Sequence, residues 1–303
     1  MKLAIICFSA LCCSLTSRAT SVAAQTLPQV QSPVPEKIKT EFKLDGFYKK
    51  CVDYNGFPIV SSGKVADQAL LEATYLIDKL LHNRKDILEG LIQGKVRFAV
   101  MAVDEFTTDI PEHSHLKPKR YWDKRARGLG ATPTAPCVSC GEENLLHLNG
   151  DKYYTESILI HEFAHAIHAV GMKVVDPKFD ERLKATYQAA MKAGKWKGLY
   201  AATNHHEYFA EAVQSWFHCN RTNDAQHNHV NSRKQLREYD PGVVKLIEYV
   251  FPDNDRWQFK FHNQRKKDLE HLKGFDFKSA PVFKWPEHLK DFDAYKWEKE
   301  NRK

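Results

Sequence analysis

His161-Glu162-Phe163-Ala164-His165 places two imidazoles four residues apart with a carboxylate between them. On an α-helix, residues four apart lie on one face about a turn from each other, so both rings can reach a single metal ion. Glu162 lies one residue further round the helix, where it can contact a metal-held water without being a ligand. This HExxH spacing is typical of zinc sites, with the two histidines as ligands and the glutamate as general base.

The residues around this stretch favour a helix from Tyr154 to Met172. Thr155 is suited to cap its start, and Gly171 is suited to the position just past its end. Burying two histidines on a mostly apolar helix is costly unless they have a partner, and a metal ion is one such partner. Two core histidines bonded to backbone carbonyls are the alternative. The apolar positions follow three- and four-residue spacings at Ile158, Phe163, Ala164, Ile167 and Val170.

A second helical segment, from His205 to Phe217, offers a third ligand. It carries an apolar stripe on one face and the carboxylate pair Glu207 and Glu211 on another. Like charges at this spacing repel unless a cation or a hydrogen-bond donor lies between them. We therefore expect Glu207 to bind the metal and Glu211 to accept a ring N–H from a ligating histidine. A solvated acidic face is the alternative.

Together these residues resemble the catalytic domain of anthrax lethal factor and the Pro-Pro endopeptidases. In that family a tyrosine precedes the glutamate ligand by seven residues, as Tyr200 precedes Glu207 here, and that glutamate opens a Glu-aromatic-Phe-Ala-Glu run, as Glu207 does. The resemblance covers roughly residues 150–217 and implies an α+β, zincin-like fold with a mixed sheet and the HExxH helix at the active site. It also implies one Zn²⁺ per chain and a peptide or protein substrate. The residues carried over are His161, His165 and Glu207 as ligands, Glu162 as base, Tyr200 as donor to the transition state, and Glu211 as the carboxylate beside a ligand.

A different class of zinc peptidase is set aside by two residues. Metzincins continue HExxH with a glycine and a third histidine, but this chain has His168 where that glycine would stand and Gly171 where that histidine would stand. The exchange removes both the turn and the ligand. His168 lies on the same helical stripe as the ligands, so it is a candidate to support them, or simply a packed or surface histidine.

We therefore expect a secreted, zinc-dependent endopeptidase of the gluzincin type, which hydrolyses peptide bonds through a metal-bound water. The alternative is a non-catalytic extracellular matrix or binding protein that keeps the fold. Hydrolysis of a non-peptide amide or ester is a narrower possibility. A decayed enzyme usually loses its base or a ligand first, and all of these positions are intact here.

The N-terminus has the pattern of a secretory signal. Lys2 is followed by an apolar run from Leu3 to Leu15, and Val22-Ala23-Ala24 is a plausible cleavage site, so residues 1–24 are expected to be removed. Removal would lower the formal net charge of the 303-residue chain from +7 to +5 by taking away two basic residues. No later segment approaches a transmembrane length, so we expect an extracellular protein without a membrane span.

Four cysteines would remain after cleavage, namely Cys51, Cys137, Cys140 and Cys219. In an oxidising compartment an even number favours up to two disulfides, with three possible pairings. A redox or zinc-knuckle role for the Cys137/Cys140 pair is the weaker reading, because no thioredoxin-like context surrounds it. Asn220-Arg221-Thr222 is an N-glycosylation sequon, expected on a surface loop.

The chain is expected to form one catalytic domain over residues 37–250, with its core at 96–220. Residues 25–36 are rich in Pro, Gln and Ser and predict a disordered lead-in. Phe47 to Val65 predicts short strands around Asn55-Gly56, and Val96 to Val103 predicts a buried strand. Periodic apolar residues predict a helix over residues 67–81.

The segment before the HExxH helix is expected to carry the substrate edge. Glu143 to Leu148 is expected to be a strand leading into that helix. In gluzincins an edge strand at this place pairs with extended peptide, so by analogy we expect residues 128–148 to form that edge.

Residues 251–303 are rich in lysine and aromatic side chains. A basic surface for polyanions would explain this composition. An arm whose aromatics pack on the catalytic domain while its lysines stay in water explains it equally, and we favour it. Secretion argues against nucleic acid as a partner.

Overall fold

The computed structural model describes residues 28–252 and 257–301, so the expected signal peptide at 1–24 lies outside the described residues. The fold is mixed α/β and is built on a five-stranded mixed sheet with strand order β1-β2-β3-β5-β4. The β1–β2 hairpin turns at Asn55-Gly56, as expected, and β2, β3 and β5 run parallel. The two-residue strand β4 is antiparallel to β5 and lies at the edge. The strands are β1 (Lys50–Tyr54), β2 (Phe57–Ser61), β3 (Arg97–Met101), β4 (Gly128–Leu129) and β5 (Cys137–Gly141).

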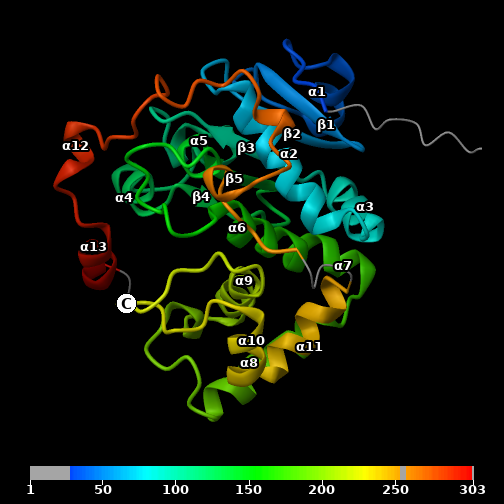
Figure 1. Cartoon of the computed structure of the whole chain (residues 1–303), viewed down its shortest axis with the longest axis vertical. Helices are drawn as coiled ribbons and strands as arrows, with labels where there is room; N and C mark the ends of the chain where they lie inside the picture. Colours follow the sequence, from blue (N-terminus) through cyan, green and yellow to red (C-terminus); the bar gives the residue numbers. More distant parts are fainter. Residues whose placement is uncertain (1–27, 253–256, 302–303) are drawn as a thin grey trace, which may run out of the picture.

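Some helices pack around the sheet, and others form a helical half of the protein on its far side (Figure 1). In Figure 1 the sheet and α1–α5 lie above α6 and α9, and α8, α10 and α11 lie below them. The helices are α1 (Glu36–Phe42), α2 (Asp67–Leu81), α3 (Lys85–Gln93), α4 (Lys119–Arg125), α5 (Glu142–Leu145), α6 (Ile158–Ala166), α7 (Met172–Val175), α8 (Phe179–Lys192), α9 (His205–Trp216), α10 (Arg233–Tyr239), α11 (Pro241–Val250), α12 (Glu287–Lys290) and α13 (Ala294–Asn301).

Helix α6 carries the HExxH residues and packs directly on the sheet. Phe163 on its buried face meets Phe57 of β2 and Phe98 of β3 edge-on, with ring centroids 5.8 and 6.5 Å apart. Each buried phenylalanine contributes about 1.5–3 kcal/mol relative to an exposed one, so this contact holds α6 in place. The opposite face of α6 is left to present its histidines to α9.

The ends of α6 differ from the expected Thr155 cap and Gly171 stop. Ser157 is the N-cap, and the side chain of Asn144 accepts a hydrogen bond from the N–H of Ile158 at 2.9 Å. At the other end the chain continues through a π-helical turn, Ile167–Gly171, into α7. A Cβ at Gly171 would lie 2.8 Å from Ile87 of α3, so this glycine permits close helix packing and does not end the helix.

The helical run Ile158–Val175 is long and apolar enough to cross a bilayer by length and composition, contrary to the expectation that no later segment would be. However, 67% of it is buried inside the protein. Its apolar surface is matched by the sheet and by α3 and α9, which identifies it as a core helix.

Two local expectations are wrong. Glu143 to Leu148 is not a strand, because Glu142–Leu145 forms α5 and the strand before it is β5. The described part of the lead-in, residues 28–36, packs against the domain. Gln31 exchanges two backbone hydrogen bonds with Cys51 at 2.8 and 3.0 Å, and Val34 is buried. Backbone pairing with an edge strand outweighs the polar composition of this segment.

The expected disulfides are also wrong, because all four cysteines are free and buried. Cys137 and Cys140 lie three apart on one strand, so their side chains face opposite sides of the sheet. Cys51 is in β1, three strands from β5, or about 14 Å at the usual strand spacing. That separation is well beyond the roughly 4.4–6.8 Å between Cα atoms that a disulfide needs.

Residues 257–301 form an arm that packs its aromatic residues on the rest of the protein. Phe259 donates its backbone N–H to Phe217 at 2.9 Å, and Phe283 donates its own to Asn149 at 2.9 Å. Arg265 reaches the carboxylate of Glu72 in α2 at 2.6 Å. The arm ends in α13, which lies against α4 (Figure 1).

Candidate metal centre and substrate groove

Three nitrogen and oxygen atoms from α6 and α9 converge on one point. The Nε2 atoms of His161 and His165 lie 3.2 Å apart, and Glu207 Oε2 lies 3.1 Å from the first and 3.4 Å from the second. The three form a nearly equilateral triangle. These are the three residues expected to be ligands, and the fold brings Glu207 to the two histidines from more than 40 residues further along the chain.

This triangle matches the ligand spacing of a zinc ion. With Zn–N and Zn–O distances of about 2.0–2.1 Å, tetrahedral geometry separates neighbouring ligand atoms by about 3.3–3.4 Å. Two imidazoles and one carboxylate are a donor set that zinc accepts while keeping an open position. The described residues therefore fit a single Zn²⁺ without rearrangement.

The electrostatics of the cluster favour positive charge. Burial lowers the pKa of His161, but its hydrogen bond to Glu207 and the carboxylates of Glu162, Glu207 and Glu211 outweigh it and raise that pKa to about 10. Burial acts to raise the pKa of Glu207, yet hydrogen bonds to both histidines hold it well below its usual value. Carboxylates that crowd an imidazole in this way stabilise a cation between them, whether a proton or a metal ion.

The start of α9 places Glu207 in its first turn. The side chain of Asn204 caps the helix by accepting hydrogen bonds from the N–H groups of His206 and Glu207 at 2.8 and 3.0 Å. A carboxylate near a helix N-terminus is also favoured by the helix dipole. The expected helix from His205 thus forms, and its cap fixes where the third candidate ligand lies.

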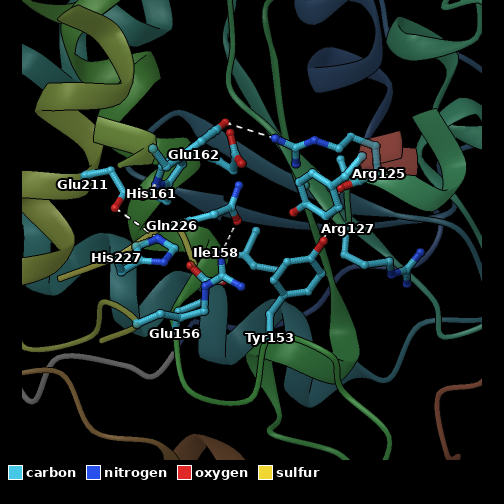
Figure 2. A pocket seen from close by; sticks show the side chains of 15 residues that line it. Arg125, Arg127, Tyr153, Glu156, Ile158, His161, Glu162, Glu211, Gln226 and His227 are labelled. Carbon is cyan, nitrogen blue, oxygen red and sulfur yellow. Dashed lines mark hydrogen bonds and ion pairs between the residues drawn. The ribbon is translucent and has the colours of Figure 1, made fainter. Parts of the chain in front are cut away.

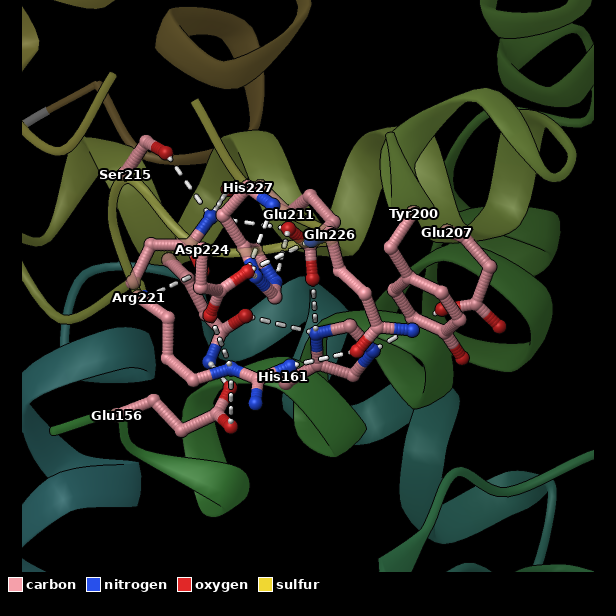
Figure 3. Close-up of polar contacts among 12 residues, drawn as sticks. Glu156, His161, Tyr200, Glu207, Glu211, Ser215, Arg221, Asp224, Gln226 and His227 are labelled. Atoms are coloured by element: carbon pink, nitrogen blue, oxygen red, sulfur yellow. Dashed lines mark hydrogen bonds and ion pairs between the residues drawn. The ribbon is translucent and has the colours of Figure 1, made fainter. Parts of the chain in front are cut away.

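The ring orientation of His161 is set by a residue that sequence reasoning missed. Its Nδ1 lies 2.8 Å from Oε1 of Gln214 but 3.5 Å from Oε1 of Glu211, the carboxylate expected to hold it. Glu211 instead pairs with His227, Nε2 to Oε2, at 3.2 Å. Figure 3 shows Glu211 beside His227, with Asp224 and Arg221 nearby and His161 below. Gln214 follows Glu207 by seven positions on the same helical face, so its spacing was the available signal.

The expected sequon at Asn220 cannot carry a glycan in this fold. Asn220 is only 3% exposed, and its amide donates to both the backbone oxygen and the carboxylate of Glu211 at 3.2 and 3.1 Å. The expectation of a surface loop is therefore wrong. The amide acts as a donor to the carboxylate network instead.

Glu162 and Tyr200 face the same space beside the three ligand atoms. Figure 2 shows His161 and Glu162 on one wall of a small pocket and Arg125 on the opposite wall. Burial raises the pKa of Glu162, which makes its carboxylate a better proton acceptor. Burial also raises the pKa of Tyr200, so its hydroxyl stays protonated and able to donate at neutral pH. Arg125 Nη2 lies 3.3 Å from that hydroxyl.

A groove of about 720 Å³ opens over these residues. Its far wall includes the C-terminal arm, since Arg125 lies over the ring of Tyr295 at 5.0 Å and its Nε lies 3.5 Å from Glu298. The residues that line it include Trp122, Arg125, residues 128–133, His161, Glu162, His165, Tyr200, His206, Glu207, Tyr295 and Glu298.

The edge strand β4 runs along this groove and closely approaches α6. A Cβ at Gly128 would lie 2.4 Å from a methyl of Ile158, and a Cβ at Gly130 would lie 2.5 Å from Cβ of His165. A side chain at either position would prevent β4 from lying this close to α6, so both glycines are needed. Arg127 anchors the strand from behind through a buried bidentate pair with Glu143 at 2.6 and 3.0 Å.

His168 does not support the three candidate ligands. Its Nε2 lies 2.9 Å from Oδ1 of Asp180 in α8, and its Nδ1 lies 3.2 Å from Nδ1 of His206. It belongs to a separate histidine cluster beside the first.

Comparison with solved structures finds similar chains. No family model matches the sequence, and no curated protein matches it. The structure of the Pro-Pro endopeptidase PPEP-2 from Paenibacillus alvei is similar to this chain with a TM-score of 0.44 and 17% sequence identity. The similarity covers 64% of this chain and 97% of that one. At this identity and TM-score the likeness carries no inference about activity, which rests on the geometry of the site.

Proposed function

We propose that this protein is a zinc-dependent endopeptidase of the gluzincin type, similar in its active-site arrangement to the anthrax lethal factor catalytic domain and the Pro-Pro endopeptidases. One observation carries the proposal. The triangle of His161 Nε2, His165 Nε2 and Glu207 Oε2, with sides of 3.1 to 3.4 Å, has the spacing of zinc ligands.

The residues around the triangle supply what peptide hydrolysis needs. A zinc ion held there would polarise the substrate carbonyl and lower the pKa of water. Glu162 lies next to His161 with a raised pKa and takes up a proton as general base, then returns it to the leaving amine. Tyr200 keeps its hydroxyl proton and donates it as a hydrogen bond to the developing oxyanion. Arg125 holds that hydroxyl in position at 3.3 Å.

The position of β4 supports a peptide as substrate. Within residues 28–252 and 257–301 this edge strand pairs only with β5, and residues 128–133 line the groove. An extended peptide can add to such an edge by main-chain hydrogen bonds, with alternate side chains directed to either side. We therefore propose residues 128–133 as the substrate edge, since the rest of the expected range 128–148 includes the inner strand β5 and the helix α5.

We propose further that the protein acts outside the cell. The support is the signal-like pattern of residues 1–24, with its basic start, apolar run and small residues before Gln25. The buried, reduced cysteines neither require nor oppose this location.

The test pairs zinc content with cleavage of a peptide library. Wild type is expected to hold one zinc at the triangle and to cleave. Glu162→Gln is expected to keep that zinc and lose nearly all turnover, because the metal site is intact but the base is absent. Glu207→Ala is expected to lose both.

Glu181→Gln changes an exposed residue of α8. It is the matched control and is expected to behave as wild type. Substantial cleavage by Glu162→Gln would remove Glu162 from the role of base. A wild type that binds zinc but cleaves no peptide would favour the alternative of a matrix or binding protein.

A further inference from the structure

A second histidine cluster lies beside the candidate zinc triangle. His168 lies in the π-helical turn that follows α6, and His205 and His206 open α9. One nitrogen from each ring lies within 4.8 Å of the other two. The two clusters share no residue, although His168 follows His165 by three positions and His206 directly precedes Glu207.

One carboxylate orients two of the three rings. Asp180 Oδ1 lies 2.9 Å from Nε2 of His168 and 2.9 Å from Nε2 of His205. Its other oxygen is taken by Lys184 at 2.7 Å. Because a carboxylate can only accept, both histidines donate from Nε2. A carboxylate that accepts from a ring N–H is the usual support of a metal-binding histidine.

A count of protons then leaves lone pairs on the inner side of the cluster. A neutral imidazole has one N–H, so His168 and His205, which donate from Nε2, have bare Nδ1 atoms. His168 Nδ1 lies 3.2 Å from Nδ1 of His206. Two bare nitrogens at this distance would repel, so either His206 places its single proton between these two rings or a cation lies there. A cation would satisfy all three rings at once.

The backbone at His168 also departs from regular helix at this point. The turn Ile167–Gly171 is π-helical, and such turns are rare and occur frequently at functional sites. The ring of His168 lies beside that of His206 at the start of α9, with ring centroids 4.8 Å apart.

We propose that His168, His205 and His206 form a second transition-metal site, with Asp180 as the residue that positions His168 and His205. Three neutral nitrogen ligands favour Zn²⁺, Co²⁺, Ni²⁺ or Cu²⁺ over Mg²⁺ or Ca²⁺, which prefer oxygen. The site joins the π-helical turn that continues α6 to the first turn of α9, and a bound ion there braces the end of α6 against α9. His206 also lines the groove, so the ion adds positive charge at its rim.

The experiment loads the full chain with Co²⁺ or Zn²⁺ by equilibrium dialysis and measures metal per chain, together with the visible spectrum of the Co²⁺ form. Wild type is expected to bind two ions. His205→Ala/His206→Ala is expected to bind one, and His165→Ala is expected to keep only the second-site ion. Asp180→Asn keeps all three ligands and is expected to weaken the second site by roughly 10–100-fold.

His115→Ala, at an exposed histidine outside both clusters, is the control for surface binding. Wild type with one ion that is lost in His165→Ala and retained in His205→Ala/His206→Ala would overturn the second site and leave the first intact. Wild type with one ion lost only in the double variant would support the second site and reject the first. Unchanged affinity in Asp180→Asn would contradict the role given to Asp180.

Discussion

Gln214 Oε1 lies 2.8 Å from Nδ1 of His161, and the amide is held in that orientation by its own nitrogen. Nε2 of Gln214 donates to Glu156 Oε2 at 3.2 Å and to the backbone oxygen of Ser157 at 3.1 Å. Oε1 must therefore accept, which makes His161 Nδ1 the protonated nitrogen and leaves the lone pair of Nε2 for the triangle. A neutral amide on α9 thus selects the tautomer of a candidate ligand on α6.

Gln214→Ala is therefore expected to weaken zinc binding by roughly 10–100-fold, the usual effect of losing a hydrogen-bond partner behind a ligand. Competition with a chelator of known affinity measures the change. Gln214→Glu keeps an acceptor at the same place and is expected to bind zinc far better than Gln214→Ala. Equal loss in both variants would mean that packing, not the hydrogen bond, is what matters at this position.

Gly130→Ala is expected to weaken zinc binding by displacing His165. The added methyl would lie 2.5 Å from Cβ of His165, a contact that real structures do not tolerate, so the strand or the ring must shift. Zinc titration of the purified variant measures the effect. Gly46→Ala is the matched control, because nothing lies within 4 Å of the added carbon there. Wild-type affinity in Gly130→Ala would show that β4 moves aside without cost.

Tyr200→Phe is expected to lower kcat by roughly 10²-fold, the scale of losing one oxyanion donor, with zinc content unchanged. The raised pKa of Tyr200 keeps the donor proton in place across neutral pH, so the deficit should not vary between pH 6 and 8. Steady-state kinetics on a cleaved library peptide separate kcat from KM. A variant with normal kcat and raised KM would make Tyr200 a binding residue.

The buried pair of Arg127 and Glu143 is expected to be costly to break from one side. Both side chains are almost fully buried, and removing one partner leaves an unpaired charge inside the protein. Glu143→Leu is therefore expected to lower the free energy of unfolding by about 3–5 kcal/mol. Arg127→Met/Glu143→Leu is expected to recover part of that loss. Urea denaturation measures both, and a double variant no better than the single one would contradict the argument.

The stability of the protein is expected to fall in acid partly through His113. Burial lowers the pKa of this side chain from 6.5 to about 4. Between these values the unfolded state takes up a proton that the folded state does not, so stability is lost as pH falls. The slope from this residue is at most about 1.4 kcal/mol per pH unit. Denaturation of wild type and His113→Gln across pH 4–7 isolates the effect, since the variant should lack that slope.

The parts of the fold that follow from local pattern could be predicted from sequence. The helix expected over residues 67–81 forms with those bounds, because its apolar residues recur at helical spacing along a single face. The hairpin at Asn55-Gly56 forms for a similarly local reason. The convergence of His161, His165 and Glu207 could also be predicted. The geometry of one helix brings the two histidines together, and a single contact between α6 and α9 adds Glu207.

The errors concern properties that only tertiary structure decides. Burial of Asn220 depends on its contact with Glu211, and the separation of Cys51 from Cys137 depends on strand order. The choice of Gln214 over Glu211 as partner of His161 depends on side-chain positions in the fold, which put their oxygens 2.8 and 3.5 Å from Nδ1. Arg125 was missed because an arginine in a polar segment has no spacing that marks it.

One wall of the groove is formed by residues near the C-terminus, which are synthesised last. Tyr295 and Glu298 of α13 close it beside Arg125, whereas the three candidate ligands are all in place by Glu207. During synthesis the earlier part of a chain emerges and begins to fold first. A nascent chain therefore contains every residue of the metal triangle before it can complete the groove, which closes only after the arm has docked.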